Sequence, residues 1–168
     1  DRIQLVLAGR GPNRRRYEEM GRTLAHPPVM AFYPKEELRD LIASCDLYVH
    51  ASDAEIEGIS CMEALACGLV PVIANSPLSA TPQFALDDRS LFQAGNAGDL
   101  ADKIDYWIEH DREREEMGRR YSEYGRQFQI GNCVSQIEDM FRTAIREQSA
   151  VGHMESSDTA ESDAGVSV

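Results

Sequence analysis

The chain has 168 residues, of which 42% are hydrophobic and 7% aromatic, and it carries a net charge of −12. This length and composition are typical of one globular domain. The negative charge argues against a nucleic-acid partner and against attraction of the whole domain to an anionic membrane surface. No apolar run approaches the roughly twenty residues that span a bilayer.

The first half of the chain alternates short apolar runs with amphipathic stretches, which predict strands and helices respectively. Predicted strands cover 3–8, 29–32, 47–50 and 70–74, and predicted helices cover 13–25, 35–44 and 59–67. This alternation is typical of an α/β fold in which helices flank a Rossmann-like parallel sheet.

The second half is mainly helical. A short helix at 82–86 and a short strand at 90–92 precede predicted helices at 97–110, 112–128 and 132–147, and Asn96 or Gly98-Asp99 is expected to cap the first of these. From about residue 148 the composition changes to small, polar and acidic residues, which bury too little apolar area to offset their ordering entropy. We therefore predict a disordered acidic tail at 148–168.

The cysteines give no sign of a metal centre. The four of them form no C-x-x-C pair and have no metal-ligand spacing with the four histidines; they are Cys45, Cys61, Cys67 and Cys133. This argues against a zinc site and against a disulfide framework. Reduced thiols are typical of a cytoplasmic protein.

Segment 52–68 places two carboxylates around the start of a predicted helix. Glu55 lies in the loop before Gly58, and Glu63 lies about one turn inside the helix, which Gly68 is expected to end. A helix start offers free N–H groups and a positive dipole end to a phosphate, while carboxylates accept hydrogen bonds from sugar hydroxyls. The pattern favours a nucleotide sugar, although either acid taken alone is more typical of a solvated helix or loop residue.

The same helix should bury one face against the sheet. Its spacing predicts that the buried stripe consists of Ile59, Met62, Ala66 and Cys67. Glu63 would then lie at the margin of that stripe.

These residues carry a family resemblance. Glu55, seven residues, Glu63 and the following Ala-Leu-Ala-Cys-Gly run resemble the signature of the family 4 retaining glycosyltransferases, which have the GT-B fold. The strand and Gly-x-Gly-Pro turn at 5–12 and the helix and strand at 38–50 are similar to the donor-binding domain of that family. The run 74–92 is similar to its lipid-directed members, the cholesterol alpha-glucosyltransferases and diacylglycerol glucosyltransferases.

The resemblance implies a function for the chain. It would be the larger part of the C-terminal donor-binding domain of a metal-independent hexosyltransferase, which moves a hexose, with glucose the first candidate, from a UDP-sugar to an acceptor hydroxyl with retention. A lipid acceptor would place the complete enzyme in the cytoplasm, at the inner face of the cell membrane, as a peripheral protein involved in glycolipid biosynthesis.

The resemblance also implies how the chain is divided. It gives a partial nucleotide-sugar-binding domain at 1–130, a C-terminal helix at 131–147 and the tail. In the family one further strand precedes the first one here and lies centrally in the sheet, so we expect an unpaired edge. The family's N-terminal domain, through which a lipid acceptor would bind, is likewise not expected here. We therefore expect a fragment that does not turn over alone.

Roles follow from the resemblance residue by residue. Glu63 matches the acid that binds the ribose hydroxyls, and Glu55 matches the catalytic acid that contacts the transferred sugar. The backbone N–H groups of Gly58, Ile59 and Ser60 would hold the diphosphate and stabilise the leaving nucleotide. We accordingly predict no metal and no cofactor beyond the UDP-sugar itself, which is the donor substrate.

Further donor-binding candidates lie at the ends of two predicted strands. Gly9 and Gly11 allow the backbone to approach a ligand, and Arg10 between them offers charge to the diphosphate or is a structural surface arginine. A dinucleotide fingerprint would need a third glycine where Arg14 stands, which argues against NAD. His50 either contacts the donor sugar or caps the predicted strand at 47–50, and both interpretations stay open.

Two positions depart from the family pattern, and two other functions remain open. Glu57 adds a third acid beside the expected phosphate site, and Phe32 is followed by Tyr33-Pro34 where the family usually has glycine. The alternatives to a transferase are a non-catalytic nucleotide-sugar-binding module or truncated inactive fragment, and an acidic Rossmann-like interaction domain that binds no nucleotide.

Overall fold

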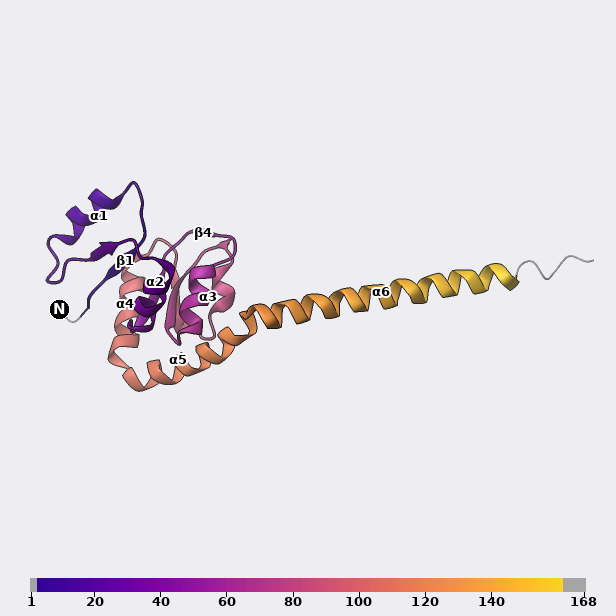
Figure 1. Ribbon diagram of the computed structural model, residues 1–168. Helices are drawn as coiled ribbons and strands as arrows, with labels where there is room; N and C mark the ends of the chain where they lie inside the picture. The colour runs from indigo at the N-terminus through magenta and orange to yellow at the C-terminus, as the bar shows by residue number, and fades with distance from the viewer. Residues whose placement is uncertain (1–2, 162–168) are drawn as a thin grey trace, which may run out of the picture. The chain divides into compact units, whose positions relative to one another are not determined.

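The computed structural model describes the backbone of residues 3–161 and the side chains of residues 3–148 (Figure 1). The chain divides into two compact units, Asp1–Tyr124 and Gly125–Val168.

The first unit contains three small sheets, and all of their pairings are parallel. β1 (Val6–Ala8) pairs with β2 (Val29–Ala31), and β4 (Ala54–Glu55) pairs with β6 (Leu78–Ser79). The third sheet has three strands in the order β3 (Leu47–His50), β5 (Val70–Asn75) and β7 (Leu91–Gln93). The predicted α/β class is confirmed. The sequence did not predict β4 and β6, because a two-residue strand is too short to show an alternation of apolar and polar residues.

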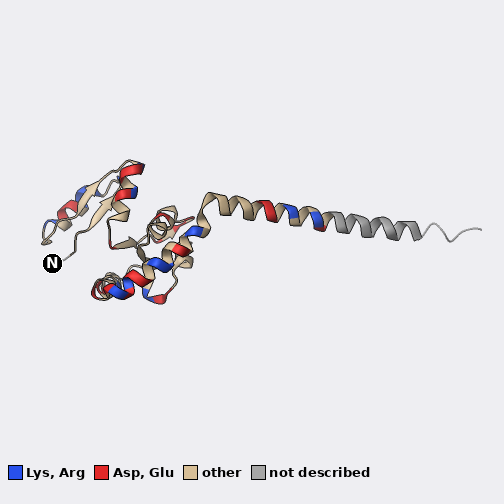
Figure 2. Cartoon of the chain, turned by 60° about the horizontal axis from the view of Figure 1, so that its bottom comes forward, with Lys and Arg blue, Asp and Glu red and all other residues tan. Residues whose placement is uncertain are grey.

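Helices alternate with these strands or follow the last of them. They are α1 (Arg14–Gly21), α2 (Lys35–Ala43), α3 (Ile59–Ala66), α4 (Ala97–Glu109) and α5 (Asp111–Gly125), with the 3₁₀ turns η1 (Thr81–Phe84) and η2 (Asp88–Ser90) between β6 and β7. Asn96 caps α4 as predicted, because its side-chain oxygen accepts hydrogen bonds from the N–H groups of Gly98 and Asp99. α1 and α5 carry both charge signs on their surfaces (Figure 2).

The core is built around β5, which lies between β3 and β7. Val70, Val72 and Ile73 are buried in succession, as expected for a parallel strand covered on both faces. α3 packs against β3 and β5, and α4 packs against β5 and β7. Trp107 of α4 and Tyr121 of α5 are fully buried and form the helical part of the core.

The buried face of α3 differs from the prediction. Cys61, Ala64 and Leu65 are buried, whereas Ile59 is 56% exposed. Ala66 is exposed, and Met62 and Cys67 are only half-buried. Small side chains at 61 and 64 allow α3 to approach the sheet closely, so the helix is rotated relative to the face that residue spacing alone indicated.

The C-terminal end of α3 confirms the predicted glycine cap. Gly68 has φ +80°, and the N–H groups of Gly68 and Leu69 donate to the carbonyls of Leu65 and Ala64. This is the Schellman arrangement, which requires a left-handed residue and turns the chain directly into β5.

The edges of β1 and β3 are unpaired, as the resemblance to the family implied. Within residues 3–161, β1 pairs with β2 and β3 pairs with β5, and no ladder joins β1 to β3. A pocket of about 520 Å³ is lined by Leu5 and Val6 on one side and by Leu47 and Val49 on the other. The apolar side chains of β1 are consequently left partly exposed.

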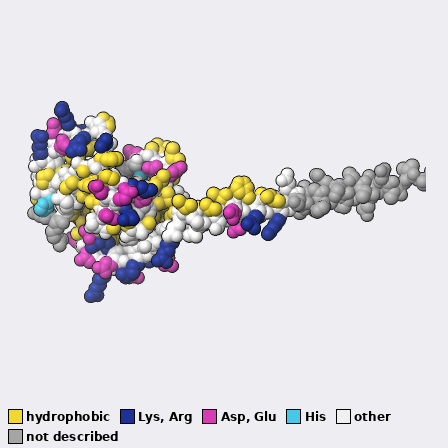
Figure 3. Space-filling model, in the orientation of Figure 1, with side chains coloured by type: hydrophobic (Ala, Val, Ile, Leu, Met, Phe, Trp, Pro, Cys, Tyr) yellow, Lys and Arg dark blue, Asp and Glu magenta, His cyan; other side chains and the backbone are white. Residues whose placement is uncertain are grey.

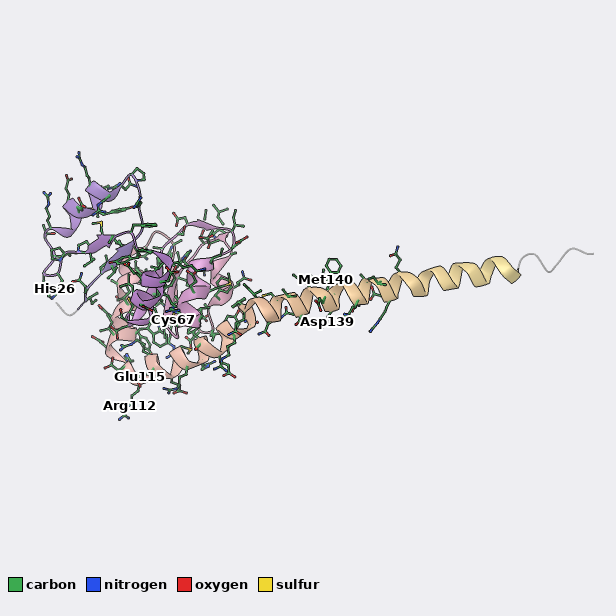
Figure 4. The ribbon with its side chains drawn as sticks, in the orientation of Figure 1. His26, Cys67, Arg112, Glu115, Asp139 and Met140 are labelled. Atoms are coloured by element: carbon green, nitrogen blue, oxygen red, sulfur yellow. The ribbon has the colours of Figure 1, made fainter. Side chains whose placement is uncertain are left out.

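The described part of the second unit contains η3 (Arg126–Phe128) and α6 (Ile130–Glu161). Exposed apolar side chains recur along the described part of α6 at helical spacing and form the yellow band of Figure 3; they include Ile130, Val134, Ile137, Phe141 and Ile145. Met140 and Asp139 are consecutive residues of α6 and extend in different directions from the helix (Figure 4). The described part of α6 is thus amphipathic.

The predicted tail differs in part from the structure. α6 continues through Glu161, so residues 148–161 are helical where disorder was expected. The composition argument concerned burial, whereas extending an existing helix needs only one local hydrogen bond per added residue. Residues 162–168 lie outside the described residues. None of the described helices has the length and apolarity needed to cross a membrane.

Candidate functional site

The start of α3 is held in place by Gly58. This glycine is the N-cap of the helix and has φ +72°, a left-handed conformation that favours glycine. A Cβ at this position would lie 2.5 Å from Thr81 Cγ2 and 3.0 Å from Phe84 Cε2 in η1. Packing against η1 therefore fixes the direction in which the first turn of α3 presents its N–H groups.

Glu55 folds back onto the loop that precedes α3. Its Oε1 accepts hydrogen bonds from the N–H groups of Ile56 at 3.0 Å and Glu57 at 3.3 Å. The pKa of Glu55 is lowered, chiefly by the N–H groups of Gly58 and Glu57 and to a lesser extent by that of Ile56. An ionised carboxylate thus lies beside the Gly58 N–H group that we expected to hold the diphosphate.

The next amides of the helix start lack such a partner. The first N–H groups of a helix precede its own hydrogen-bond ladder, so those of Ile59 and Ser60 have no acceptor within α3. Both residues are exposed and line a pocket of about 350 Å³ together with Glu55, Ile56 and Glu57. These two amides remain for an anionic ligand.

His50 lies at the carboxyl end of β3 and is 7% exposed. Its Nε2 is buried and makes no hydrogen bond within the described part of the chain, although Glu55 Oε2 is 3.9 Å away. Burial lowers the pKa of His50, and the Glu55 carboxylate opposes that shift. The structure therefore brings His50 and Glu55 together, as two of the predicted site residues.

Tyr48 is a member of this site that the sequence did not indicate. Its hydroxyl lies 3.1 Å from His50 Nδ1 and 2.8 Å from Ser60 Oγ. Burial raises the pKa of Tyr48 to about 12, so the hydroxyl keeps its proton. The sequence offered one signal for Tyr48: it lies two residues before His50 on the same strand, and residues two apart on a strand share a face.

Glu63 does not share a pocket with Glu55. It is exposed on the second turn of α3 and lines a pocket of about 450 Å³ with α2 residues that include Lys35, Leu38 and Ile42. The expectation of two acids around one cavity is therefore corrected. Glu55 is drawn into its own loop by backbone N–H groups, whereas the helical rotation turns Glu63 toward α2.

Gly9, Arg10 and Gly11 form a third location at the carboxyl end of β1. They line a pocket of about 260 Å³, and the Gly9 N–H donates to the Ala31 carbonyl at 2.8 Å. The Arg10 guanidinium stacks over the Phe32 ring, 4.4 Å from its centroid. This contact gives Arg10 a structural role at the surface, and the Arg10 side chain remains exposed to solvent.

The described residues contain no cluster of three metal-ligating side chains. The predicted independence from metal ions rests on the positive helix start and stays a prediction. All four cysteines are free.

Comparisons with known proteins confirm the resemblance. The family model described as glycosyl transferases group 1 matches residues 1–128. The catalytic domain of cholesterol-alpha-glucosyltransferase from Helicobacter pylori is 46% identical and superposes with a TM-score of 0.72, covering 76% of this chain and 80% of that one.

Two further relatives are more distant. HepE from Anabaena, solved in complex with UDP, has a TM-score of 0.71 at 20% identity over 84% of this chain and 41% of that one, which supports the fold alone. An uncharacterized glycosyltransferase, YqgM of Bacillus subtilis (strain 168), is 28% identical over 130 residues. That match covers 74% of this chain but 34% of the relative, so the chain spans about a third of its length. The predicted GT-B fold is confirmed.

Proposed function

This chain belongs to the group 1 glycosyl transferase family, and on that premise we propose that it is the donor-binding part of a retaining hexosyltransferase. The complete enzyme moves a hexose, with glucose the first candidate, from a UDP-sugar to an acceptor hydroxyl. The observation that carries this proposal is the start of α3, where the N–H groups of Ile59 and Ser60 lie at a pocket bordered by Glu55.

The spacing along α3 suits a nucleoside diphosphate. Ser60 and Glu63 are three residues apart, so they share a helix face and are separated by about 4.5 Å along the axis. A diphosphate at the first turn would place its attached ribose at this height. Glu63 then accepts hydrogen bonds from the ribose hydroxyls, and the pocket between α2 and α3 offers room for the base.

Glu55 and His50 bind the sugar end of the donor. The Glu55 carboxylate is held ionised by backbone N–H groups, and its free lone pairs accept hydrogen bonds from sugar hydroxyls. His50 Nε2 faces the same carboxylate. Gly9, Arg10 and Gly11 approach the donor from the end of β1, with Arg10 contributing charge.

The chemical contribution of this domain is stabilisation of the leaving group. Negative charge grows on the diphosphate as the glycosidic bond breaks, and the N–H groups at the helix start would stabilise that charge. We propose that this replaces a divalent cation.

The acceptor is inferred from similarity. The Helicobacter pylori relative is named for transfer of glucose to cholesterol, and it is 46% identical. We therefore propose a sterol or other lipid acceptor, bound through a domain outside this chain, and a peripheral location at the inner face of the cell membrane.

Calorimetric titration with UDP and UDP-glucose tests the donor site. We expect Glu63→Ala to weaken UDP binding about tenfold or more, since hydrogen bonds to a charged group contribute ~1.5–3 kcal/mol. Glu55→Ala should instead remove the preference for UDP-glucose over UDP. Glu115→Ala, at an exposed position of α5 (Figure 4), is the matched control and should bind as the parent does.

Absence of any binding heat at millimolar UDP would favour an interaction domain and contradict the proposal. Binding without transfer by the full-length protein, assayed with UDP-glucose and a sterol acceptor, would favour a non-catalytic nucleotide-sugar-binding module.

A further inference from the structure

A chain of hydrogen bonds connects the buried His50 to the surface of the candidate site. It runs from His50 Nδ1 to the Tyr48 hydroxyl at 3.1 Å, and from that hydroxyl to Ser60 Oγ at 2.8 Å. Ser60 is exposed at the first turn of α3. At the other end, the buried His50 Nε2 makes no hydrogen bond within residues 3–148 and faces Glu55 Oε2 at 3.9 Å.

When His50 is neutral, the nearby carboxylate sets the direction of this chain. A proton on Nε2 faces the negative Glu55, so Nδ1 is left as an acceptor. Tyr48 then donates to Nδ1, and its oxygen accepts the hydrogen of Ser60. The Ser60 hydroxyl therefore turns its lone pairs outward, which repels a phosphate oxygen.

When His50 is protonated, the direction reverses. Both ring nitrogens become donors, so Nδ1–H donates to the Tyr48 oxygen. Tyr48 must then donate to Ser60 Oγ, which leaves the Ser60 hydrogen free to point outward. The same serine now presents a donor beside the N–H groups of α3.

We propose that Tyr48 and His50 are positioning residues that switch the Ser60 hydroxyl from acceptor to donor, so that a diphosphate binds together with a proton on His50. The inference rests on the proposed function, since it concerns the diphosphate of the same donor. By linkage, binding of the diphosphate raises the proton affinity of His50 by the same factor.

His50 is the group in this neighbourhood that changes charge near neutral pH. From β3 it faces Tyr48, whose pKa is raised to about 12. Tyr48 in turn interacts with the α3 thiol of Cys61, whose pKa burial also raises to about 12. From the loop His50 faces Glu55, whose lowered pKa keeps it ionised. Burial lowers the pKa of His50 from its ordinary value, so donor binding should strengthen as the pH falls through the pKa of this ring.

Calorimetry with UDP-glucose between pH 8 and pH 5 tests the linkage. This ligand is chosen because its diphosphate is esterified at both ends and does not titrate in that range. We expect affinity to rise about tenfold as His50 becomes protonated, the size of one hydrogen bond to a charged group. Heats measured in buffers of different ionisation enthalpy should show proton uptake on binding at pH 7.

Tyr48→Phe interrupts the chain while keeping the ring, and it should bind UDP-glucose with little dependence on pH. Ser60→Ala should lose the same dependence. The matched control is Tyr106→Phe, which loses a hydroxyl bonded to Arg89 and Glu113 away from the site and should keep the parental pH profile. Urea unfolding of each variant establishes that it is folded.

The tautomer of His50 supplies a second readout. Nitrogen-15 chemical shifts of the labelled imidazole should show the proton on Nε2 at pH 8 in the parent, and bound UDP-glucose should raise the titration midpoint of this ring. A parent that binds without a pH slope, or a slope retained in Tyr48→Phe, would overturn the inference alone. Failure of the parent to bind at every pH would overturn the proposed function and the inference with it.

Discussion

Two glycine turns at the carboxyl ends of parallel strands differ in how firmly they are built. The turn after β1 is open: nothing lies within 4 Å of a Cβ placed on Gly9 or Gly11. The turn before α3 is filled, because η1 packs directly against Gly58 and backbone N–H groups bind the Glu55 carboxylate. Both turns carry predicted donor-binding residues.

The comparison separates two uses of glycine at a ligand site. At Gly58 the residue satisfies packing as well as φ, so the helix start is preorganised before any ligand arrives. At Gly9, where φ is +149°, only the backbone conformation favours glycine. We therefore expect the α3 turn to contribute rigid N–H groups and the β1 turn to adjust to the donor.

The largest expected effect is that of Gly58→Ala on stability. The added methyl group meets Thr81, and alanine must adopt the left-handed conformation that Gly58 has; together these should cost about 2–4 kcal/mol. Gly95→Ala is the matched control, since Gly95 has φ +79° with nothing within 4 Å, and Gly9→Ala tests the other turn. Each of these two should cost about 1 kcal/mol in urea unfolding.

A double variant sharpens this result. Adding Thr81→Ser to Gly58→Ala removes the Cγ2 methyl group that the new Cβ would meet, so part of the lost stability should return. An equal cost for Gly58→Ala and Gly95→Ala would mean that packing against η1 contributes nothing.

Arg10→Ala should have an intermediate effect that appears in binding rather than in stability. Its stacking on Phe32 is exposed and is worth about 0.5–1 kcal/mol. If Arg10 contributes charge to the diphosphate, the variant should weaken UDP binding severalfold at low salt and less at high salt. Phe32→Ala, which removes the stacking partner but keeps the charge, is the control; equal affinity of Arg10→Ala and the parent would assign the arginine a purely structural role.

The smallest expected effect concerns the pH dependence of stability at Glu55. Its pKa is lower in the folded protein than in the unfolded chain, so the stabilisation is present above the unfolded value of 4.5 and is lost as the pH falls through the folded value. Glu55→Gln should therefore be slightly less stable than the parent at pH 7 and should approach it in acid. Urea midpoints at pH 7 and pH 3 measure the difference, and a constant gap between the two proteins would contradict this account.

Prediction from the sequence succeeded where local chemistry decides structure. β3 has its predicted bounds, Asn96 caps α4, and Gly68 ends α3 in the expected left-handed conformation. It failed on the buried face of α3, since the closeness of helix and sheet depends on neighbours that the helix sequence does not contain. It also missed Tyr48, whose importance comes from a contact twelve positions along the chain.

The sequence by itself determined the α/β alternation, the helix start with its flanking acids and the family to which these belong, because strand periodicity, caps and turn glycines act over a few residues. Only the tertiary structure decided that Glu55 and Glu63 line different pockets, and that His50 is buried behind Tyr48 with one nitrogen unpartnered. The direction of a side chain depends on how helix, strand and η1 pack together, and that packing joins residues distant in sequence.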